Sequence, residues 1–571
     1  MSEREDDDQA ASEAAERDAD DSGADSPGSK PSPAPEADDR DSEPPPRSAE
    51  KKPKKAPDAA PAGPFPLPRR TAHGLALLSG LLYFAAFPGI DVWPLAFVAL
   101  APLVVALRGQ PPRRAAGIGW TAGFAMTMCG FYWLLEMLKT FSGFATPLCL
   151  LFMAILCGYQ AGRIALMGYV AGRIEQKGWP AGVAFALAFV ASELLYPLLF
   201  PWAYGATVHQ VPVMLQLAEL LGPIGVGLAL VTTNLAVAEI AISRLEKRPT
   251  AWRKVLALAA VTALSVVYGA VRIPMVDAAE RAAPKARVGI VQANMSLMGK
   301  RRDKSEGLRR HMELTRELQK EGPLDLVVWS ETSVMAPQDE EIAPAVYRSQ
   351  FAATLGAPAI FGAVLVRRVP DVREYVFFNS ALLSDAKGEV AGRYDKQFLL
   401  AFGEYLPFGE QFPQLYEISR NSGRFTPGKT LLPLKLGERG IATFICYEDI
   451  SAPFVRSIVN SGATDLLVNI TNDAWFGDTT EPWIHLALAK LRAIEHRRYL
   501  VRSTNSGVSA FVDPVGRVKK HTGTFRKEAI AAEIAWLKPT TLYGLIGETP
   551  WWLVTAVALG LCFYRRKEAS E

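Results

Sequence analysis

Three reactive side chains in the second half of the chain each follow a short run of mostly apolar residues. Glu331 follows the letters LVVWS, Lys396 closes the segment GRYDK, and Cys446 follows IATFI. Strand ends and the loops after them are where α/β folds collect their chemistry. Taken singly, the glutamate also fits a structural ion pair, the lysine a surface charge and the cysteine a small buried apolar side chain.

The three residue types together make a complete set for acyl transfer. A thiol attacks a carbonyl carbon, a carboxylate moves the proton, and a lysine with backbone N–H groups stabilises the oxyanion. Cys446 is the only one of five cysteines outside the long apolar runs, and it lies where a predicted strand turns into a predicted helix. A helix amino terminus and a nearby ammonium both lower the pKa of a thiol. We therefore expect Cys446 to be a nucleophile with a lowered pKa.

The elements that must position these residues lie between residues 285 and 540, where β-rich runs alternate with polar helices. This alternation predicts one α/β domain of catalytic size. Strands are expected at 287–292, 324–329, 358–366, 375–384, 389–394, 440–446, 465–470, 499–503, 508–513 and 529–534. Helices are expected at 303–321, 341–355, 452–461 and 481–497, and a long loop at 396–433.

Apolar stretches on both sides of this domain predict membrane spans. Seven stretches fall in a membrane domain over 64–275, and an eighth makes a final span at 546–566. The seven lie near 71–88, 92–107, 115–138, 145–172, 180–200, 212–242 and 253–272. Clusters of Lys and Arg fall on alternate loops, which predicts that those loops and both termini are cytoplasmic. After seven crossings, residues 285–540 are expected on the opposite face.

Composition and charge exclude several classes of protein. A hydrophobic fraction of 49% together with a polar amino-terminal tail excludes an ordinary soluble enzyme. Residues 1–63 are acidic and poor in large apolar side chains, and we expect a disordered cytoplasmic tail. The six histidines show no ligand spacing, so no metal is predicted. Phosphate-binding glycine loops are absent and the basic residues flank the apolar runs, so neither a cofactor nor nucleic acid is expected.

Five short motifs, taken in order, give the sequence a family resemblance. They are WSET at Glu331, YDK at Lys396, FGEYLPF around Glu404, ICYE around Cys446 and NDAWFG around Trp475. This set resembles the nitrilase superfamily, and with the flanking spans it is similar to apolipoprotein N-acyltransferases of the bacterial inner membrane. The fold class implied is an αββα nitrilase-like sandwich facing the periplasm, joined to a multi-span helical membrane domain.

The resemblance also implies roles for particular residues. Glu331, Lys396 and Cys446 would form the catalytic triad. Supporting or substrate-binding roles are implied for Glu404, Glu448, Asn379, Tyr447, Tyr405 and Trp475. Where the family commonly has a tryptophan about thirty residues before the glutamate, this chain has Lys300, Arg301 and Arg302. These cations suit lipid phosphates, and they equally suit a solvated basic loop.

The reaction implied by the resemblance has two steps. Cys446 takes an acyl chain from a phospholipid, and the thioester then acylates the α-amino group of a diacylglyceryl-cysteine at the amino terminus of an apolipoprotein. The aromatic loop 397–413 would be a lid dipping toward the membrane, with a packed core loop as the alternative. We expect a monomer, with no metal and no cofactor.

Two other classes of function use parts of the same set. A membrane-tethered amidase or carbamoylase would use the same triad and transfer the acyl group to water. A lipoprotein-binding module would keep the fold without needing the thiol. Eight spans argue against the first, since a soluble amide needs no access from the bilayer, and an intact triad argues against the second.

Overall fold

The computed structural model describes residues 65–296, 303–351, 355–368, 375–400, 403–406, 408–418 and 423–566. These residues belong to one compact unit, Ala62–Glu571. The predicted disordered tail, the basic triplet 300–302 and Phe402 of the predicted lid lie outside the described residues.

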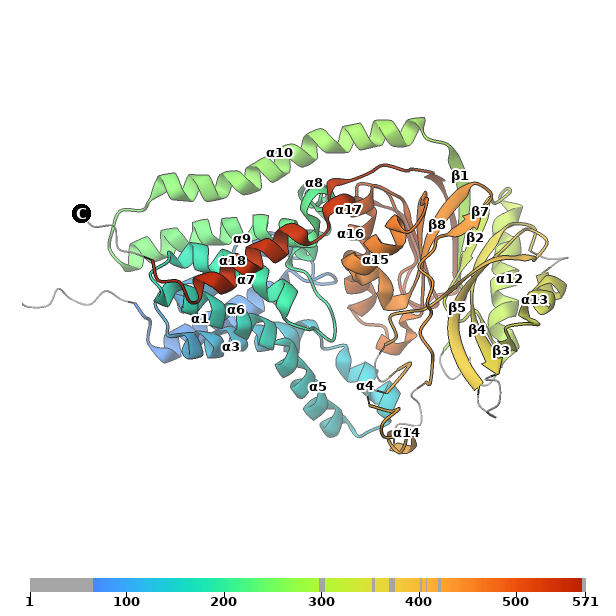
Figure 1. Cartoon of the computed structure of the whole chain (residues 1–571), viewed down its shortest axis with the longest axis horizontal. Coiled ribbons are helices and arrows are strands. Elements are labelled where there is room, and N and C mark those ends of the chain that lie inside the picture. Colours follow the sequence, from blue (N-terminus) through green and yellow to red (C-terminus); the bar gives the residue numbers. More distant parts are fainter. Residues whose placement is uncertain are drawn as a thin grey trace, which may run out of the picture. The chain divides into compact units, whose positions relative to one another are not determined.

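Helices make up the first part of this unit (Figure 1). They are α1 (Arg69–Ala85), η1 (Trp93–Phe97), α2 (Ala101–Leu107), α3 (Pro112–Gly130), α4 (Leu134–Ser142), α5 (Thr146–Gln160), α6 (Gly162–Gln176), α7 (Ala181–Leu195), η2 (Tyr204–Val208), α8 (Pro212–Leu215), α9 (Ala218–Leu245) and α10 (Trp252–Ala282). Near the carboxyl terminus, α17 (Leu542–Ile546) and α18 (Thr549–Leu561) rejoin them. Each of the eight predicted apolar spans coincides with one helix or with a broken pair.

Fewer of these helices are long enough to span a bilayer alone. Among the described residues, Ala218–Leu245, Trp252–Ala282 and the nearly continuous run Thr146–Gln176, which is α5 with α6, are long and apolar enough. The pair α3 and α4 makes a fourth if two helices bent by 61° count as one span. The others are shorter. Proline stops two of them, Pro88 after α1 and Pro197 after α7, because it lacks the N–H that a continuing helix needs. Eight crossings therefore stay a prediction.

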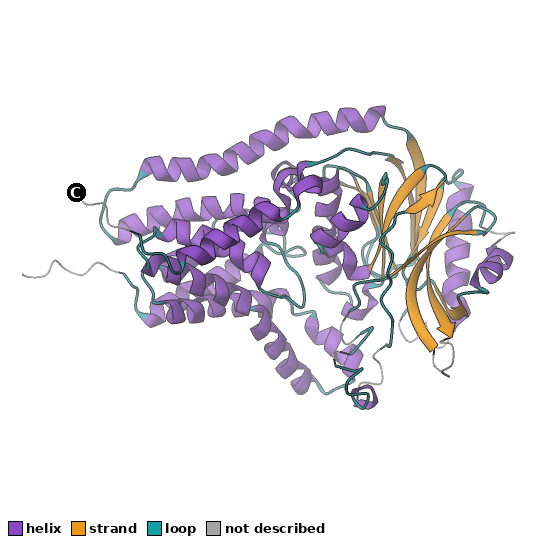
Figure 2. Cartoon of the chain, in the orientation of Figure 1, coloured by secondary structure: helices purple, strands orange, loops and turns teal. Residues whose placement is uncertain are grey.

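Two stacked β-sheets make up the second part, with helices on their outer faces (Figures 1 and 2). The first sheet has the order β13-β1-β2-β4-β5-β6, with β3 beside β4. Its strands are β1 (Lys285–Gln292), β2 (Leu326–Trp329), β3 (Val334–Asp339), β4 (Ala359–Arg368), β5 (Tyr375–Ser384), β6 (Val390–Asp395) and β13 (Glu528–Ala535). Helices α12 (Lys304–Lys320) and α13 (Ala343–Phe351) cover it.

The second sheet has the order β12-β11-β10-β9-β8-β7. Its strands are β7 (Leu434–Leu436), β8 (Arg439–Ile445), β9 (Leu466–Thr471), β10 (Leu500–Thr504), β11 (Ala510–Val512) and β12 (Val518–His521). Helices α15 (Ala452–Asn460) and α16 (Glu481–His496) lie between this sheet and the helical part (Figure 1). Short helices η3 (Cys446–Ile450), η4 (Asp473–Phe476) and α14 (Leu415–Ile418) sit in connections. The predicted αββα sandwich is confirmed.

Buried apolar strands hold the two sheets together. Every residue of β2 and β9 is buried, as expected for strands covered on both faces. The hydroxyl of Ser503 on β10 donates to the carbonyl oxygens of Val291 and Val328 in the other sheet, at 3.3 and 3.1 Å. This packing brings the carboxyl ends of β2, β6 and β8 to one region, where the predicted reactive residues follow them.

Candidate active site

Glu331 and Lys396 meet in the interior although they follow different strands. Glu331 comes shortly after β2 and Lys396 directly after β6, and their side chains are 8% and 2% exposed. The Nζ atom of Lys396 lies 3.5 Å from Oε1 of Glu331 and 2.8 Å from Oε2 of Glu404. One ammonium therefore serves two carboxylates. A surface lysine is excluded by this burial.

Asn379 joins the two carboxylates from the neighbouring strand β5. Its Nδ2 donates to Oε1 of Glu331 at 2.7 Å and to Oε1 of Glu404 at 2.8 Å. Oε2 of Glu404 also accepts from the backbone N–H of Leu400 at 2.9 Å, which fixes the loop after Lys396. These contacts orient Glu331 and hold the ammonium beside it.

Cys446 begins the short helix η3, is 4% exposed and has a φ angle of 55°. A non-glycine residue in this left-handed region occupies a strained turn of the kind that presents nucleophiles. Burial and the Glu331 carboxylate raise the pKa of the thiol well above its usual range, and the opposing effects of Lys396 and Thr471 are smaller. The predicted lowering of the Cys446 pKa is therefore wrong. The sequence did not show that the thiol is buried near a carboxylate.

Lys396 stays charged in this setting. Burial alone would lower its pKa, but the carboxylates of Glu404 and Glu331 raise it well above the usual value. The resting site therefore holds a neutral thiol, an ammonium, and the Glu331 carboxylate, which is near enough to the thiol to raise its pKa. Such a thiol needs a base at the moment of attack.

Glu448 holds the backbone on either side of the site together. Its carboxylate accepts from the backbone N–H groups of Ile445, Gln397 and Phe398 at 2.8, 2.7 and 3.0 Å, and from the Tyr394 hydroxyl at 2.9 Å. Burial raises the pKa of Glu448 to about 7. It thus links the end of β8 to the loop that carries Lys396.

Tyr447 and Trp475, two of the predicted supporting residues, both contact the protein interior. The Tyr447 hydroxyl donates to Oε1 of Glu481 at 2.5 Å, and its ring stacks on His485 with centroids 4.7 Å apart. The structure therefore directs this side chain into the interior. Trp475 on η4 is half-buried and packs against the core.

Tyr405 lies at an open cleft of about 890 Å³ that Phe377, Phe408 and Tyr416 also line. Phe398, Phe408 and Phe412 are 52%, 69% and 58% exposed. This exposure argues against a packed core loop and suits a lid over 397–413.

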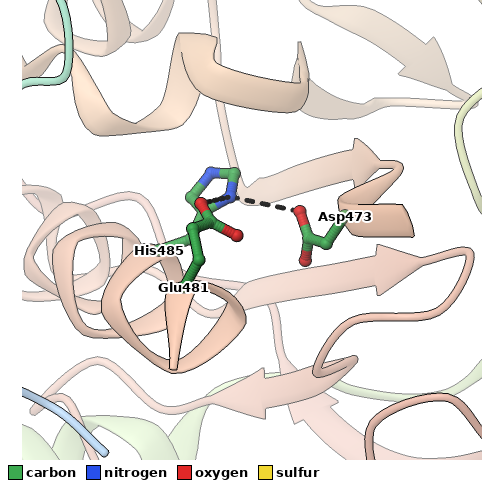
Figure 3. A group of neighbouring side chains, drawn as sticks. All are labelled: Asp473, Glu481 and His485. Atoms are coloured by element: carbon green, nitrogen blue, oxygen red, sulfur yellow. Dashed lines mark hydrogen bonds and ion pairs between the residues drawn. The ribbon is translucent and has the colours of Figure 1, made fainter. Parts of the chain in front are cut away.

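Behind the nucleophile lies a second group of charged residues, which we call the buried ionic cluster: Asp449, Asp473, Glu481, His485 and Arg502. Three of them, Asp473, Glu481 and His485, have ligand-type atoms within 4.8 Å of one another (Figure 3). His485 Nδ1 lies 3.3 Å from Asp473 Oδ1, and Nε2 lies 2.8 Å from Asp449 Oδ1. The histidine spacing in the sequence did not reveal this cluster, because Asp449 and Asp473 lie on other elements than His485.

The charges of this cluster balance without a metal ion. Burial and Arg502 lower the pKa of His485, but Asp449 and Asp473 outweigh them and raise it to about 9. A protonated imidazole has no lone pair to offer a metal. Arg502 adds a second cation, 2.9 Å from Asp449 and 3.1 Å from Asp473, and burial raises the pKa of Glu481 to about 8. The donor set fits an ionic cluster better than a metal site.

The buried ionic cluster reaches the nucleophile through one amide. Arg502 Nη1 donates to Oδ1 of Asn469 at 2.7 Å, and Asn469 Nδ2 donates to the carbonyl oxygen of Cys446 at 3.0 Å. Asp449 lies on the same short helix as Cys446. The cluster therefore fixes the strained turn that presents the thiol.

A buried Glu, Lys and Cys at the edge of an αββα sandwich define a carbon–nitrogen hydrolase domain, and the carbon-nitrogen hydrolase family model matches residues 287–536. The model of the apolipoprotein N-acyltransferase N-terminal domain matches residues 79–236.

The chain belongs to the apolipoprotein N-acyltransferase family. It is 31% identical to the apolipoprotein N-acyltransferase of Azotobacter vinelandii, over 86% of this chain and 95% of that protein. Those of Geobacter metallireducens and Brucella melitensis are 29% and 30% identical, over 88% and 86% of this chain and 96% of each relative. The protein is accordingly a membrane N-acyltransferase.

Proposed function

We propose that this protein moves an acyl chain from a phospholipid to Cys446, and then to the α-amino group of the amino-terminal diacylglyceryl-cysteine of an apolipoprotein. One observation carries the proposal. The Lys396 ammonium pairs with the Glu331 and Glu404 carboxylates, and Lys396 and Glu331 both act electrostatically on the buried thiol of Cys446. The apolar helices that flank this domain give a reason for lipid substrates. The catalytic triad is Glu331, Lys396 and Cys446.

In the first step the neutral thiol attacks the ester carbonyl of the phospholipid while Glu331 takes its proton. The tetrahedral oxyanion is stabilised by the Lys396 ammonium, which its two carboxylate partners keep charged. Collapse breaks the bond to the glycerol oxygen, and Glu331 returns the proton to that oxygen. The products are a lysophospholipid and a Cys446 thioester.

In the second step the free amine attacks the thioester carbonyl. Glu331 takes the proton from the amine nitrogen, the C–S bond breaks, and the same proton restores the thiol. The net change is an ester exchanged for an amide, with no redox step. Asn379 and Glu404 position the acid and the ammonium, and Glu448 positions the Lys396 loop.

For the orientation, we infer an inner-membrane protein with residues 285–540 in the periplasm and both termini in the cytoplasm. Residues 64–275 and 546–566 form its membrane domain, and 1–63 its cytoplasmic tail. Basic residues gather at one end of the helical part, where Arg108 and Arg248 pair with Glu246 and Lys254 pairs with Glu239. Such an end is typical of the cytoplasmic face. Reporter fusions after Ala283 and after Glu571 should report periplasm and cytoplasm, and the reverse would overturn this topology.

The decisive experiment separates a transferase from a hydrolase. With phospholipid alone, the purified protein should release about one equivalent of lysophospholipid and then stop with an acyl group on Cys446. A diacylated lipopeptide with a free α-amino group should restart turnover, and its N-acetylated form should not. Continuous release without any amine would instead establish the alternative function, a membrane-tethered nitrilase-type hydrolase.

A further inference from the structure

A cavity of about 260 Å³ lies where the helical part meets helices α15 and α16 of the catalytic part. Its walls come from α7 and the loop after it, the kinked start of α9, the helices α15 and α16, and the segment α17–α18. Most of the lining is apolar, including Leu194, Trp202, Ile224, Ala452, Leu488 and Trp551. None of Glu331, Lys396 and Cys446 lines it. The cavity is therefore separate from the site described above.

Arg492 on α16 brings a buried cation to this cavity. The residue is 1% exposed, and its Nη2 donates to Oε1 of Glu495 at 2.5 Å. Its Nε and Nη1 atoms have no hydrogen-bond partner among the described residues. Leaving such donors unpaired in an apolar setting is unfavourable. An anionic group inside the cavity would remove this cost.

A carboxylate on the same wall supplies the opposite charge. Glu548 lines the cavity and accepts a hydrogen bond from Tyr543, and no Lys or Arg of the described residues forms an ion pair with it. Glu193, which also lines the cavity, is paired with Arg163 at 2.9 Å. The cavity thus offers unpaired guanidinium donors and one uncompensated carboxylate.

The surroundings of the cavity suit a molecule with apolar chains. Leu195, Leu199, Leu545 and Trp552 lie within two residues of a lining residue in the chain and are 36%, 43%, 64% and 51% exposed. The volume holds a phosphate with a short polar group but not two acyl chains. Chains attached to such a headgroup would lie along this exposed apolar surface.

We propose that the cavity binds the headgroup of a zwitterionic phospholipid that is not the acyl donor, with its phosphate on Arg492 and its ammonium near Glu548. A free phosphate would pair only with the arginine and would face the uncompensated carboxylate. An anionic headgroup without an amine would meet the same repulsion. The bound lipid would fill the junction between the membrane helices and the catalytic part.

The test uses the full-length protein, stripped of lipid in detergent, and a dialkyl ether phosphatidylethanolamine with a photoreactive diazirine at the top of one chain. Its ether linkages prevent it from donating an acyl group. Peptide mapping should place labelling within 194–202 or 542–552. Arg492→Gln should reduce labelling of these segments about tenfold, the loss expected for a charged hydrogen-bond pair. Arg281→Gln is the matched control, because Arg281 is exposed at the end of α10 and lies outside the cavity.

A second variant covers the case in which Arg492→Gln fails to fold. Ala452→Phe fills the cavity and leaves the Arg492–Glu495 pair in place, and it should reduce the same labelling about tenfold. The matching ether phosphatidylglycerol should label about tenfold less, since it lacks the ammonium, and inorganic phosphate should not compete. The proposal fails if Ala452→Phe labels as the wild type does, if the glycerol headgroup labels equally, or if inorganic phosphate displaces the probe.

Discussion

Two groups of charged side chains flank Cys446, and they differ in how their charges are balanced. On one side the carboxylates of Glu331 and Glu404 share the single ammonium of Lys396. On the other side Asp449 and Asp473 face two cations, His485 and Arg502. The first group keeps a carboxylate in excess that can take up a proton. The second is neutral and buried, and it serves to hold the turn at Cys446.

The largest effect is expected at the nucleophile itself. Cys446→Ala should release no burst of lysophospholipid and should lower turnover by at least about 10⁴-fold, because the covalent route is lost. The protein should still fold, since a smaller side chain replaces a neutral thiol. The measurement is burst kinetics, with a thermal melt as the control. Normal acyl transfer by this variant would refute the covalent mechanism.

Loss of the Glu331 carboxylate should slow acylation nearly as much. Glu331→Gln keeps the shape and the contact with Asn379 but removes the base, and acylation should slow by about 10³-fold. Lys396→Met should slow it comparably, because the oxyanion loses its ammonium. Single-turnover acylation checks both, with the melting temperature as the control for folding. A folded Glu331→Gln enzyme with near-normal acylation would return this residue to a structural ion pair.

A change in the buried ionic cluster should lower the stability of the protein more than its acylation rate. His485→Gln removes one partner of a buried pair and should cost about 3–5 kcal/mol of unfolding free energy. The acylation rate of protein that remains folded should fall by less than for Glu331→Gln. Chemical denaturation and acylation, measured on the same samples, distinguish the two groups. Loss of activity by His485→Gln with unchanged stability would contradict a structural role for the buried ionic cluster.

The same histidine predicts a pH dependence of stability. Its pKa is raised from 6.5 to about 9 in the folded protein, so protonation favours folding. This contribution should be complete below pH 6.5 and should be lost as pH rises through 9. Melting temperatures of the wild type should fall across this interval, and those of His485→Gln should fall less. Parallel curves for the two proteins would contradict the assignment of the charge to His485.

The smallest effect is expected far from both groups. Deleting residues 2–60 should leave specific activity and membrane insertion unchanged, because the predicted cytoplasmic tail contacts neither the site nor the spans. Activity assays on membranes matched for protein amount test this. A loss greater than about tenfold, equivalent to 1.4 kcal/mol, would contradict it.

Apolar runs in the sequence were enough to predict the central strands, since β2, β8 and β9 are buried along their whole length or nearly so. Three strands were missed. β3 contains proline and charged or amide side chains, β7 has three residues, and β12 carries exposed lysines and a histidine. None of them shows a run of apolar residues, because each is short or partly exposed. The surrounding sheet determines their structure.

The types of the candidate catalytic residues could be predicted from the sequence, but the burial and the charges around them could not. The burial of Cys446 beside Glu331, which reverses the direction of its pKa shift, depends on how β2 and β8 are stacked. His485 was missed because its partners Asp449 and Asp473 lie 36 and 12 residues away on other elements. The motifs that contain Asp449 and Asp473 could be seen in the sequence. Their approach to His485 could not, because it depends on the order of the strands in the sheet.

Helix α10 has a mechanical consequence for where the reaction takes place. Its 31 residues span about 46 Å, against about 30 Å for a bilayer core. Arg272 on α10 and Arg497 at the end of α16 both bind Glu219 at the start of α9, and β1 begins three residues after the helix ends. The sheet that contains β1 is therefore attached almost directly to the end of a long helix. One residue inserted after Arg272 would turn β1 by about 100° and raise it by about 1.5 Å. We therefore expect the length of α10 to set the depth in the bilayer at which the ester of the proposed phospholipid substrate meets the thiol.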